Sequence, residues 1–379
     1  MKTIKEITVF SIGDSNEIKT WSNVPYFFTK SLEEKHIKVN RVNIEENSFL
    51  KSIYKYSIFA LLKLLNKNSD HTYFRSGLNH FLTNRKIQAA IKHYSNADVQ
   101  LFLTYSFSTD KFNAKKVVLF SDWSYLYFIK NFLKREPAWF EKKALSREKQ
   151  NIEEADIVLS LFPKSLEFNT IHYKSKHLHY LGNVINGNYP LDIKQLIYQK
   201  LKSNKLLFIG NKKYINGALG LIKAFKSISE KRKVKSELHI IGLTEEQIGI
   251  KIPGLFYYGY LDKGIETQNE QYYKLVSEAR AIINTNPDWG AFSAMTEAMY
   301  YFTPVITSPY PEFTETYGHE IDFGYYVNSN SPEELVLKIE TILSDSSDKQ
   351  IELMNAAHQK VKDFTWSTYT DKVLDLISE

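Results

Sequence analysis

Residues 284–308, NTNPDWGAFSAMTEAMYYFTPVITS, decide the fold class that we predict for this chain. An apolar run ends in a Pro-Asp-Trp-Gly turn, a helical stretch opens around Ser293, and a second apolar run follows at residues 303–308. A strand, a helix and another strand in direct succession are typical of a parallel sheet whose faces are covered by helices. The stretch therefore predicts an α/β fold.

Similar apolar, β-branched runs recur along the chain. We expect strands at residues 7–13, 38–44, 99–105, 116–121, 156–162, 177–183, 205–210, 237–242, 255–260, 279–285, 303–308 and 323–327. Apolar runs of this length fit strands that helices bury on both faces, and the pattern occurs once in each half of the chain. We therefore predict two Rossmann-like domains whose parallel sheets face a central cleft.

The domain boundary is expected between residues 183 and 204, because the stretch GNVINGNYPLDIKQ mixes Gly, Asn and Pro before a helical segment. This places an N-terminal domain at residues 1–187 and a C-terminal domain at residues 195–364. Within the latter, Ser331 before Pro332 has the pattern of a helix N-cap. The closing helical stretch, residues 366–379, is expected to pack back on the N-terminal domain.

Composition limits the function. The chain has 379 residues, of which 43% are hydrophobic, enough for two ordinary cores. Zero cysteines exclude disulfides, thiolate metal sites and cysteine nucleophiles. The N-terminus has no apolar stretch of signal length, and no apolar segment reaches the roughly 20 residues that a spanning helix needs. We therefore expect a cytoplasmic protein whose contact with a membrane, if any, is peripheral.

Charge separates the two halves of the chain. Residues 1–190 carry 28 Lys and Arg against 18 Asp and Glu, whereas residues 191–379 carry 21 against 25. The basic first half predicts an anionic partner, such as a phospholipid surface, a lipid diphosphate or an acidic glycan. No recognised nucleic-acid-binding motif is found, so nucleic acid is not an expected partner.

The loop after the first expected strand is one candidate site, because ligands of open parallel sheets bind beyond the carboxyl ends of the strands. It begins with Gly13 and Asp14 and leads through Trp21 and Ser22 into a helical stretch. A glycine lets the backbone approach a phosphate or a sugar, and the helix N-terminus offers free N–H groups. A plain strand-to-helix turn has the same pattern, so both interpretations stay open.

A second candidate loop opens the second half of the chain. Gly210 is followed by Lys212 and Lys213 and then by a helix that we expect to start near Asn216 and Gly217. The lysines would neutralise a leaving diphosphate while the helix start supplies N–H donors. A solvated surface loop would look the same.

The third candidate loop lies in the stretch quoted first. The backbone amides of Phe292, Ser293 and Ala294 are expected to face a diphosphate, and Glu297 to accept both hydroxyls of a ribose. A glutamate on a helix face is more often a solvated charge. Glu297, however, stands in the apolar sequence AMTEAMYYF, which disfavours simple solvation.

Motifs in both halves together resemble glycosyltransferase family 4 and its relatives with the two-domain architecture called GT-B. The motifs are WSNVP, FSDWS and IEEADIVLSLFPKS in the first half, and FIGNKKYINGA, FYYGYLDK, PDWGAFSAMTEA, TPVITS and FTW in the second. Each is weak alone, but their order and spacing cover nearly the whole chain. The resemblance implies retaining transfer from a nucleotide sugar, which is a co-substrate, with no cofactor.

The resemblance assigns donor-side roles residue by residue. Glu297 matches the second glutamate of a pair separated by seven residues, which implies ribose binding. Gly259 and Tyr260 match the segment whose backbone edges the base, and Gly13 matches the phosphate-side glycine of the first loop. The loop at Gly210 matches the donor clamp.

The resemblance also assigns an acceptor side. Asp122 falls near a position that is often a histidine, which makes it a candidate for orienting or deprotonating an acceptor hydroxyl. Asp14, Trp21, Ser22 and Trp123 complete the predicted acceptor site. A helix N-cap before Trp123 is an equally open interpretation of Asp122.

Several positions depart from the family pattern. The first glutamate of the pair falls on Trp289, so Asp288 is the nearest acidic substitute; Gly290 and Ala291 complete this predicted donor turn. The arginine and lysine of the donor clamp fall on Asn211 and Asn216, and we expect Lys212 or Lys213 to compensate. Phe302 stands where the family commonly has a glycine before Pro-Val.

We predict no metal site. His177 and His179 share one face of an expected strand but lack a third partner, so a structural role is favoured. No carboxylate pair at a strand end demands a divalent cation, which agrees with the metal-independent habit of the GT-B class.

The segment FLKSIYKYSIFALLKLLNK, residues 49–67, has the pattern of an amphipathic helix. Four lysines lie along one helical side, and the apolar residues lie largely on the other. Such a helix either lies at an anionic membrane interface or packs on its own domain.

The sequence as a whole predicts transfer of a hexose from a UDP- or GDP-sugar to a glycan or lipid-linked acceptor with retention, in bacterial surface polysaccharide or glycoconjugate biosynthesis. Asp122, Asp288 and Glu297 are the candidate catalytic residues. Two alternatives stay open: a catalytically impaired GT-B scaffold that binds glycan or partners an active transferase, and inverting transfer on the same fold.

Overall fold

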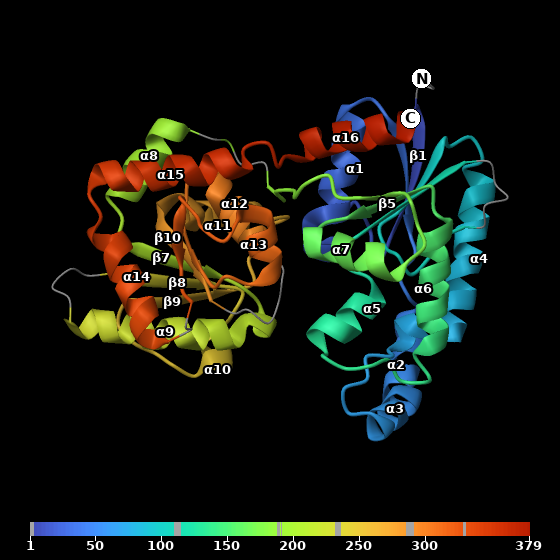
Figure 1. Cartoon of the computed structure of the whole chain (residues 1–379), viewed down its shortest axis with the longest axis horizontal. Helices are drawn as coiled ribbons and strands as arrows, with labels where there is room; N and C mark the ends of the chain where they lie inside the picture. The colour runs from blue at the N-terminus through green and yellow to red at the C-terminus, as the bar shows by residue number, and fades with distance from the viewer. Residues whose placement is uncertain are drawn as a thin grey trace. The chain divides into compact units, whose positions relative to one another are not determined.

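The computed structural model describes residues 4–109, 115–187, 190, 192–231, 236–285, 292–328 and 331–379. The chain divides into two compact α/β units (Figure 1): unit 1 comprises Met1–Asn183 and Trp366–Glu379, and unit 2 comprises Val184–Thr365. No helix in the described ranges is long and apolar enough to cross a membrane.

Unit 1 is built on a six-stranded sheet whose strand order is β2-β1-β3-β4-β5-β6. Every neighbouring pair runs parallel. The strands are β1 (Glu6–Ser11), β2 (Lys38–Asn43), β3 (Val99–Phe102), β4 (Lys116–Ser121), β5 (Ile157–Ser160) and β6 (Leu178–His179).

Helices cover both faces of this sheet (Figure 1). The helices of unit 1 are η1 (Thr20–Asn23), α1 (Val24–Glu34), α2 (Ser48–Tyr54), η2 (Lys55–Phe59), α3 (Ala60–Leu65), η3 (Tyr73–Arg75), α4 (Gly77–His93), α5 (Tyr125–Tyr127), η4 (Phe128–Phe132), α6 (Lys142–Glu154), α7 (Pro163–His172) and α16 (Trp366–Ser378). On one face, Ile87 of α4 and Ile152 of α6 join the strand side chains in one buried cluster. On the other, the Phe28 ring of α1 stacks on Trp366 of α16, with ring centroids 5.1 Å apart.

Unit 2 repeats the plan with a parallel sheet of order β12-β11-β10-β7-β8-β9. Its strands are β7 (Lys205–Ile209), β8 (Glu237–Ile241), β9 (Leu255–Gly259), β10 (Ala279–Asn284), β11 (Val305–Thr307) and β12 (Gly324–Tyr326). Its helices are α8 (Ile193–Leu201), η5 (Lys212–Tyr214), α9 (Ile215–Lys231), α10 (Glu245–Ile248), α11 (Glu266–Glu278), α12 (Ser293–Tyr300), α13 (Pro311–Tyr317), α14 (Pro332–Ser344) and α15 (Ser347–Val361). Helices α9 and α14 cover one face of the sheet, and α8, α11, α12 and α15 lie over the other (Figure 1).

Both sheets confirm the predicted α/β fold class, and a strand overlaps each of the twelve expected runs. The predicted N-cap of α14 is also confirmed, since Ser331 Oγ accepts a hydrogen bond from Glu334 N at 3.1 Å. Each sheet has one point at which the strand order reverses, between β1 and β3 in unit 1 and between β7 and β10 in unit 2. Open α/β sheets bind ligands beside such switch points, at the carboxyl ends of the strands.

Candidate functional site

The switch point of unit 2 brings two of the predicted donor loops side by side, because β7 and β10 are neighbours. Gly210 follows β7, and its N–H donates to Ile241 O at 3.0 Å. The exposed residues Lys212 and Lys213 belong to the short helix η5, and α9 starts directly after it. A helix start and two cations thus lie at the carboxyl end of the strand, as anion binding requires.

The helix α9 begins close to the predicted position. Asn216 and Gly217 are its second and third residues, so both lie in its first turn; because η5 runs directly into α9, the N–H of Ile215 before them already donates to Lys212 O. Asn216 is exposed and Gly217 is buried. Neither Asn211 nor Asn216 supplies a positive charge; Asn211 instead caps η5 by accepting from Lys213 N at 3.0 Å.

The other donor helix, α12, begins at Ser293 after β10. Phe292 precedes it as a buried N-cap and packs edge-on against Phe313, with ring centroids 5.5 Å apart. Ser293 and Ala294 open the first turn, so their N–H groups are among those without an intrahelical partner. Four predicted donor residues, Asp288, Trp289, Gly290 and Ala291, lie outside the described residues.

Glu297, in α12, is almost fully buried, with 4% of the residue exposed. Its Oε1 accepts from Lys263 Nζ at 2.5 Å and from Tyr273 OH at 2.8 Å. Its Oε2 accepts from Tyr272 OH at 3.1 Å. Glu297 is therefore not a solvated surface charge but the centre of a buried polar cluster, which we call the Glu297 cluster: Glu297, Lys263, Tyr272 and Tyr273.

Charge in the Glu297 cluster is balanced internally. The Lys263 ammonium also donates to Asn186 O at 2.9 Å and lies 4.3 Å from the centroid of the Tyr272 ring. Burial lowers the pKa of Lys263, whereas the Glu297 carboxylate acts to raise it. Burial, reinforced by Glu297, raises the pKa of both tyrosines well above the ordinary value, so both phenols are neutral donors at neutral pH.

Gly187, in the boundary stretch, lies directly beside the Glu297 cluster. A Cβ atom at Gly187 would lie 2.1 Å from Tyr273 OH and 2.6 Å from Glu297 Oε1. Both distances are shorter than a van der Waals contact, so any larger residue would push the carboxylate or the phenol aside. The stretch that the sequence indicated only as a domain boundary thus forms one wall around Glu297.

The predicted base-edging segment ends β9. Gly259 has a left-handed φ of 61°, and its N–H donates to Leu243 O at 3.1 Å. Tyr260 follows with 65% of its surface exposed. The chain then turns into the loop that carries Lys263, which joins this segment to the Glu297 cluster.

The first loop of unit 1 begins with a glycine whose backbone is left-handed. Gly13 has a φ of 96°, and its N–H donates to Asn43 Oδ1 at 3.1 Å, so this N–H is already paired. Asp14 Oδ1 accepts from Asn16 N at 2.8 Å and thereby closes a local turn. Three consecutive residues with side chains, Trp21, Ser22 and Asn23, also have positive φ, of 35°, 53° and 72°. Left-handed backbone at such residues costs free energy and clusters at functional sites.

A pocket of about 260 Å³ lies at the carboxyl ends of β1, β3 and β4 in unit 1. It is lined by Ile12, Trp21, Phe74, Arg75, Leu103, Thr104, Tyr105, Ser106, Ser121, Asp122, Trp123 and Glu148. The structure thus brings three of the predicted acceptor residues, Trp21, Asp122 and Trp123, into one pocket at the switch point. Asp14 and Ser22 are not among the lining residues.

Asp122 is held by its own loop. Its Oδ1 accepts from Trp123 N at 2.9 Å and from Ser121 Oγ at 3.2 Å. The interpretation of Asp122 as a helix N-cap is wrong, because α5 is capped by Ser124, whose Oγ accepts from Tyr127 N at 3.3 Å.

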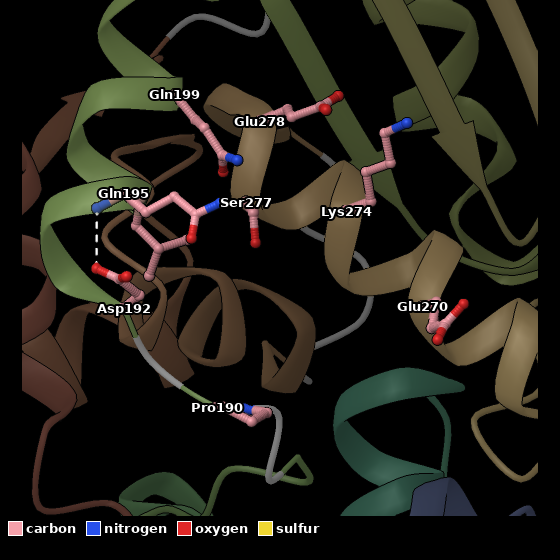
Figure 2. Close-up of a pocket in the computed structure, with 9 residues that line it drawn as sticks. Pro190, Asp192, Gln195, Gln199, Glu270, Lys274, Ser277 and Glu278 are labelled. Carbon is pink, nitrogen blue, oxygen red and sulfur yellow. Dashed lines mark hydrogen bonds between the residues drawn. The ribbon is translucent and has the colours of Figure 1, made fainter.

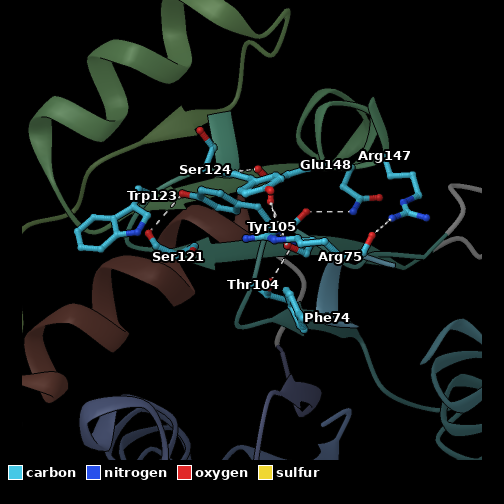
Figure 3. Close-up of polar contacts among 12 residues, drawn as sticks. Phe74, Arg75, Thr104, Tyr105, Ser121, Trp123, Ser124, Arg147 and Glu148 are labelled. Carbon is cyan, nitrogen blue, oxygen red and sulfur yellow. Dashed lines mark hydrogen bonds and ion pairs between the residues drawn. The ribbon is translucent and has the colours of Figure 1, made fainter. Parts of the chain in front are cut away.

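Sequence reasoning missed an ion pair in the same pocket (Figure 3). Arg75 Nη1 donates to Ser106 Oγ at 2.5 Å and lies 3.3 Å from Glu148 Oε2. Glu148 Oε1 accepts from Tyr125 N, and the guanidinium of Arg75 lies 4.0 Å from the centroid of the Tyr125 ring. No sequence motif announced this pair, because its members are 73 residues apart.

A second cavity, of about 390 Å³, lies in unit 2 between α8 and α11 (Figure 2). Its lining includes Asp192, Glu270 and Glu278, with Lys274 as its one lining cation. Glu278 ends α11 directly before β10, so the cavity extends to the amino end of that strand, opposite the switch-point loops. Its negative charge would repel a diphosphate, and we do not assign the donor to it.

Comparison with solved structures identifies the fold. A sucrose-phosphate synthase from Thermosynechococcus elongatus matches with 16% identity and a TM-score of 0.66, over 99% of this chain and 98% of that chain. WaaG, a glycosyltransferase involved in lipopolysaccharide biosynthesis, matches with 13% identity and a TM-score of 0.65, over 98% and 99%. HepE from Anabaena, in complex with UDP-glucose, matches with 13% identity and a TM-score of 0.59, over 98% and 99%. The chain therefore has the GT-B fold of glycosyltransferases.

Most of unit 2 also matches a known family by sequence. Residues 192–360 match the family described as Glycosyl transferases group 1. The resemblance that the motifs indicated is thus confirmed. Comparison with curated proteins finds no match.

Proposed function

We propose that the chain is a retaining, metal-independent hexosyltransferase, which moves a hexose from a UDP- or GDP-sugar to a hydroxyl of a glycan or lipid-linked acceptor. We further propose that it acts in the cytoplasm, in bacterial surface polysaccharide or glycoconjugate biosynthesis. The observation that carries the proposal is the position of Glu297: it is buried one turn into the helix after β10, beside the switch point, within the segment that matches group 1 glycosyltransferases.

In the proposed donor site the diphosphate meets the first turns of α9 and α12, with the exposed Lys212 and Lys213 of η5 just before α9. Such groups stabilise charge that develops on the leaving group as the glycosidic bond breaks, so no covalent nucleophile is required. Asp288 is proposed to take the sugar-side role of the missing first glutamate. Gly259 and Tyr260 are proposed to edge the base.

Ribose binding by Glu297 requires a rearrangement. A carboxylate offers about four acceptor positions, and three are filled by Lys263, Tyr272 and Tyr273. Two ribose hydroxyls therefore need at least one of these donors to leave. We propose that Lys263 moves from Glu297 towards the diphosphate and so supplies the cation that Asn211 and Asn216 lack.

The proposed acceptor site is the unit 1 pocket. Asp122 would orient the acceptor hydroxyl, while Trp21 and Trp123 offer aromatic surfaces to a sugar ring. Arg75 is neutralised by its ion pair with Glu148, so it offers N–H donors to acceptor hydroxyls rather than a free positive charge.

An impaired scaffold that binds glycan is the second candidate. It is favoured by Trp289 at the first glutamate position and by the three donors that already saturate most of Glu297. On this proposal Lys263, Tyr272 and Tyr273 permanently hold the Glu297 carboxylate, which then binds no nucleotide.

A panel of UDP- and GDP-sugars separates the two candidates. We expect release of nucleoside diphosphate from one donor, and the same donor to raise the melting temperature of the chain. Glu297→Gln keeps the side-chain shape, and its loss of donor turnover would tie activity to the site. Absence of both turnover and thermal shift across the panel would favour the scaffold, and the anomeric configuration of a product distinguishes retention from inversion.

A further inference from the structure

One helical segment of unit 1 is attached to the domain by very few side chains. Helices α2, η2 and α3 follow one another without a break from Ser48 to Leu65. Among the residues of these three helices only Tyr54 and Leu62 are buried. The sequence left open whether this segment packs on its own domain, and the structure shows that most of it does not. We call residues 48–67 the basic apolar segment.

The two buried side chains of the segment, Tyr54 and Leu62, lie on either side of the π-helical turn η2. Tyr54 and Leu62 are eight positions apart, which an ideal α-helix would place about 80° apart around its axis. The π-helical turn η2 lies between them and departs from this ideal geometry. Tyr54 then packs on Tyr73 of η3, with ring centroids 5.7 Å apart, and its hydroxyl donates to His71 O at 3.3 Å.

The rest of the segment presents large apolar side chains to solvent. The exposed fractions are 71% for Phe49, 50% for Ile53, 77% for Tyr56, 52% for Ile58, 58% for Leu61, 82% for Leu64 and 61% for Leu65. Large apolar patches are rare on the surface of soluble monomers and usually mark an interaction site.

The charge of the segment selects the kind of partner. Residues 48–67 contain four lysines, Lys51, Lys55, Lys63 and Lys67, and no Asp or Glu. One of the four, Lys51, is paired, with Glu46 just outside the segment. Lysines without acidic neighbours in the same segment, together with exposed apolar side chains, are typical of helices that lie in the plane of an anionic membrane. A protein partner of the same chemistry would need an acidic rim around an apolar groove.

We propose that the basic apolar segment docks unit 1 on an anionic membrane. Leu61, Leu64 and Phe49 enter the interface between headgroups and acyl chains, and the lysines contact lipid phosphates. The inference goes beyond the proposed transfer reaction and does not depend on it, because docking requires neither Glu297 nor a nucleotide.

Sedimentation of the full chain with lipid vesicles tests the proposal. We expect vesicles that mix phosphatidylglycerol with phosphatidylcholine to bind the chain about tenfold more tightly than phosphatidylcholine alone, with added salt reducing the difference. Leu61→Asp with Leu64→Asp, and separately Lys51, Lys55, Lys63 and Lys67→Gln, should each weaken binding by about tenfold or more. All six positions are half-buried or exposed, so the variants should melt close to the parent.

Matched controls use exposed positions outside the segment. Ile171→Asp with Leu337→Asp, which are 73% and 58% exposed, should bind vesicles like the parent chain. So should the variant in which the exposed lysines Lys194, Lys223, Lys226 and Lys251 become Gln. Binding that neither segment variant weakens would overturn the proposal. It would equally fail if no vesicle binds and Leu61→Asp with Leu64→Asp dissociates a dimer seen in analytical ultracentrifugation.

Discussion

The backbone of Phe302 gives a physical reason for the glycine that is common at this position in the family that the chain resembles. The sequence indicated only that a glycine is common at this position. The structure gives Phe302 a φ of 59°, a left-handed conformation that favours glycine. The ring is buried and stacks on His358, with ring centroids 4.1 Å apart. Packing of the aromatic ring therefore offsets the strained backbone.

Because of this backbone conformation, we expect glycine to be less destabilising than alanine at position 302. Both Phe302→Ala and Phe302→Gly lose the buried ring, at a cost of about 3 to 5 kcal/mol. Alanine keeps the left-handed penalty of about 1 kcal/mol, whereas glycine does not. We expect Phe302→Gly to be the more stable variant in chemical denaturation. The opposite order would show that the strain is absent.

Gly187 leads to a second prediction at this scale. Gly187→Ala would place its Cβ against Tyr273 and Glu297, so we expect a loss of about 1 to 3 kcal/mol in the stability of unit 2. Gly220→Ala is the matched control, because the added Cβ meets nothing within 4 Å inside α9 and helix propensity favours alanine by about 1 kcal/mol. Calorimetry should show shifts of opposite sign; equal shifts would contradict the tight approach at Gly187.

The ion pair of Lys263 and Glu297 leads to a third prediction. Lys263→Met leaves a buried carboxylate without its cation, which we expect to cost about 3 to 5 kcal/mol. Lys263→Met combined with Glu297→Gln removes both charges and should recover most of that stability. The double variant should nevertheless lose donor turnover, because neither ribose binding nor the proposed cation remains. Additive losses of stability would show that the two residues do not interact.

At the scale of elements, the strands were the most predictable feature of this chain. Residues such as Val117, Val118, Leu119 and Phe120 are buried on both faces of the sheet, and burial on both faces requires the continuous apolar runs that identify a strand. The π-helical turn η2 was not predictable, because its residues, Lys55–Phe59, continue the same apolar and basic pattern as the α-helices on either side.

Helix α4 carries a pH-dependent contact. The His80 ring stacks on Phe107, with ring centroids 5.7 Å apart. Burial, with Arg147 and Lys143 nearby, lowers the pKa of His80 to about 4. Between pH 6.5 and about pH 4 the unfolded chain binds a proton that the folded chain refuses, so stability falls as the pH falls through this window.

We therefore expect unit 1 to lose stability on acidification, and His80→Gln to remove about 1 kcal/mol of that loss. Urea unfolding followed by tryptophan fluorescence measures this, because four of the five tryptophans lie in unit 1. His239→Gln in unit 2 is the control. Parallel pH profiles for the parent and His80→Gln would contradict the assignment to His80.

At the scale of the whole molecule, the sequence predicted the fold better than the site. The fold follows from many strand and helix patterns that agree with one another. The Glu297 cluster instead joins the boundary stretch, the loop after β9, helix α11 and helix α12. Only Glu297 stood out locally, whereas Lys263, Tyr272 and Tyr273 gain their meaning from a contact across the fold.

The division into two units leads to a final prediction. A nucleotide that binds only folded unit 2 should stabilise that unit by about 2.7 kcal/mol at a hundred times its dissociation constant. Calorimetry with UDP or GDP should therefore shift the transition of unit 2, while tryptophan fluorescence, which follows unit 1, should change little. A shift confined to unit 1 would contradict nucleotide binding by unit 2.

The return of α16 to unit 1 has a consequence for synthesis of the chain. Trp366 and Tyr369 cover Phe28 and Phe120, all of which are almost fully buried. The ribosome makes these covering residues only after every residue of unit 2. Unit 2 can therefore complete its core during translation. Unit 1 is made first, but its aromatic face stays uncovered until α16 is synthesised, and an exposed apolar face of this kind is a site for chaperone binding or aggregation.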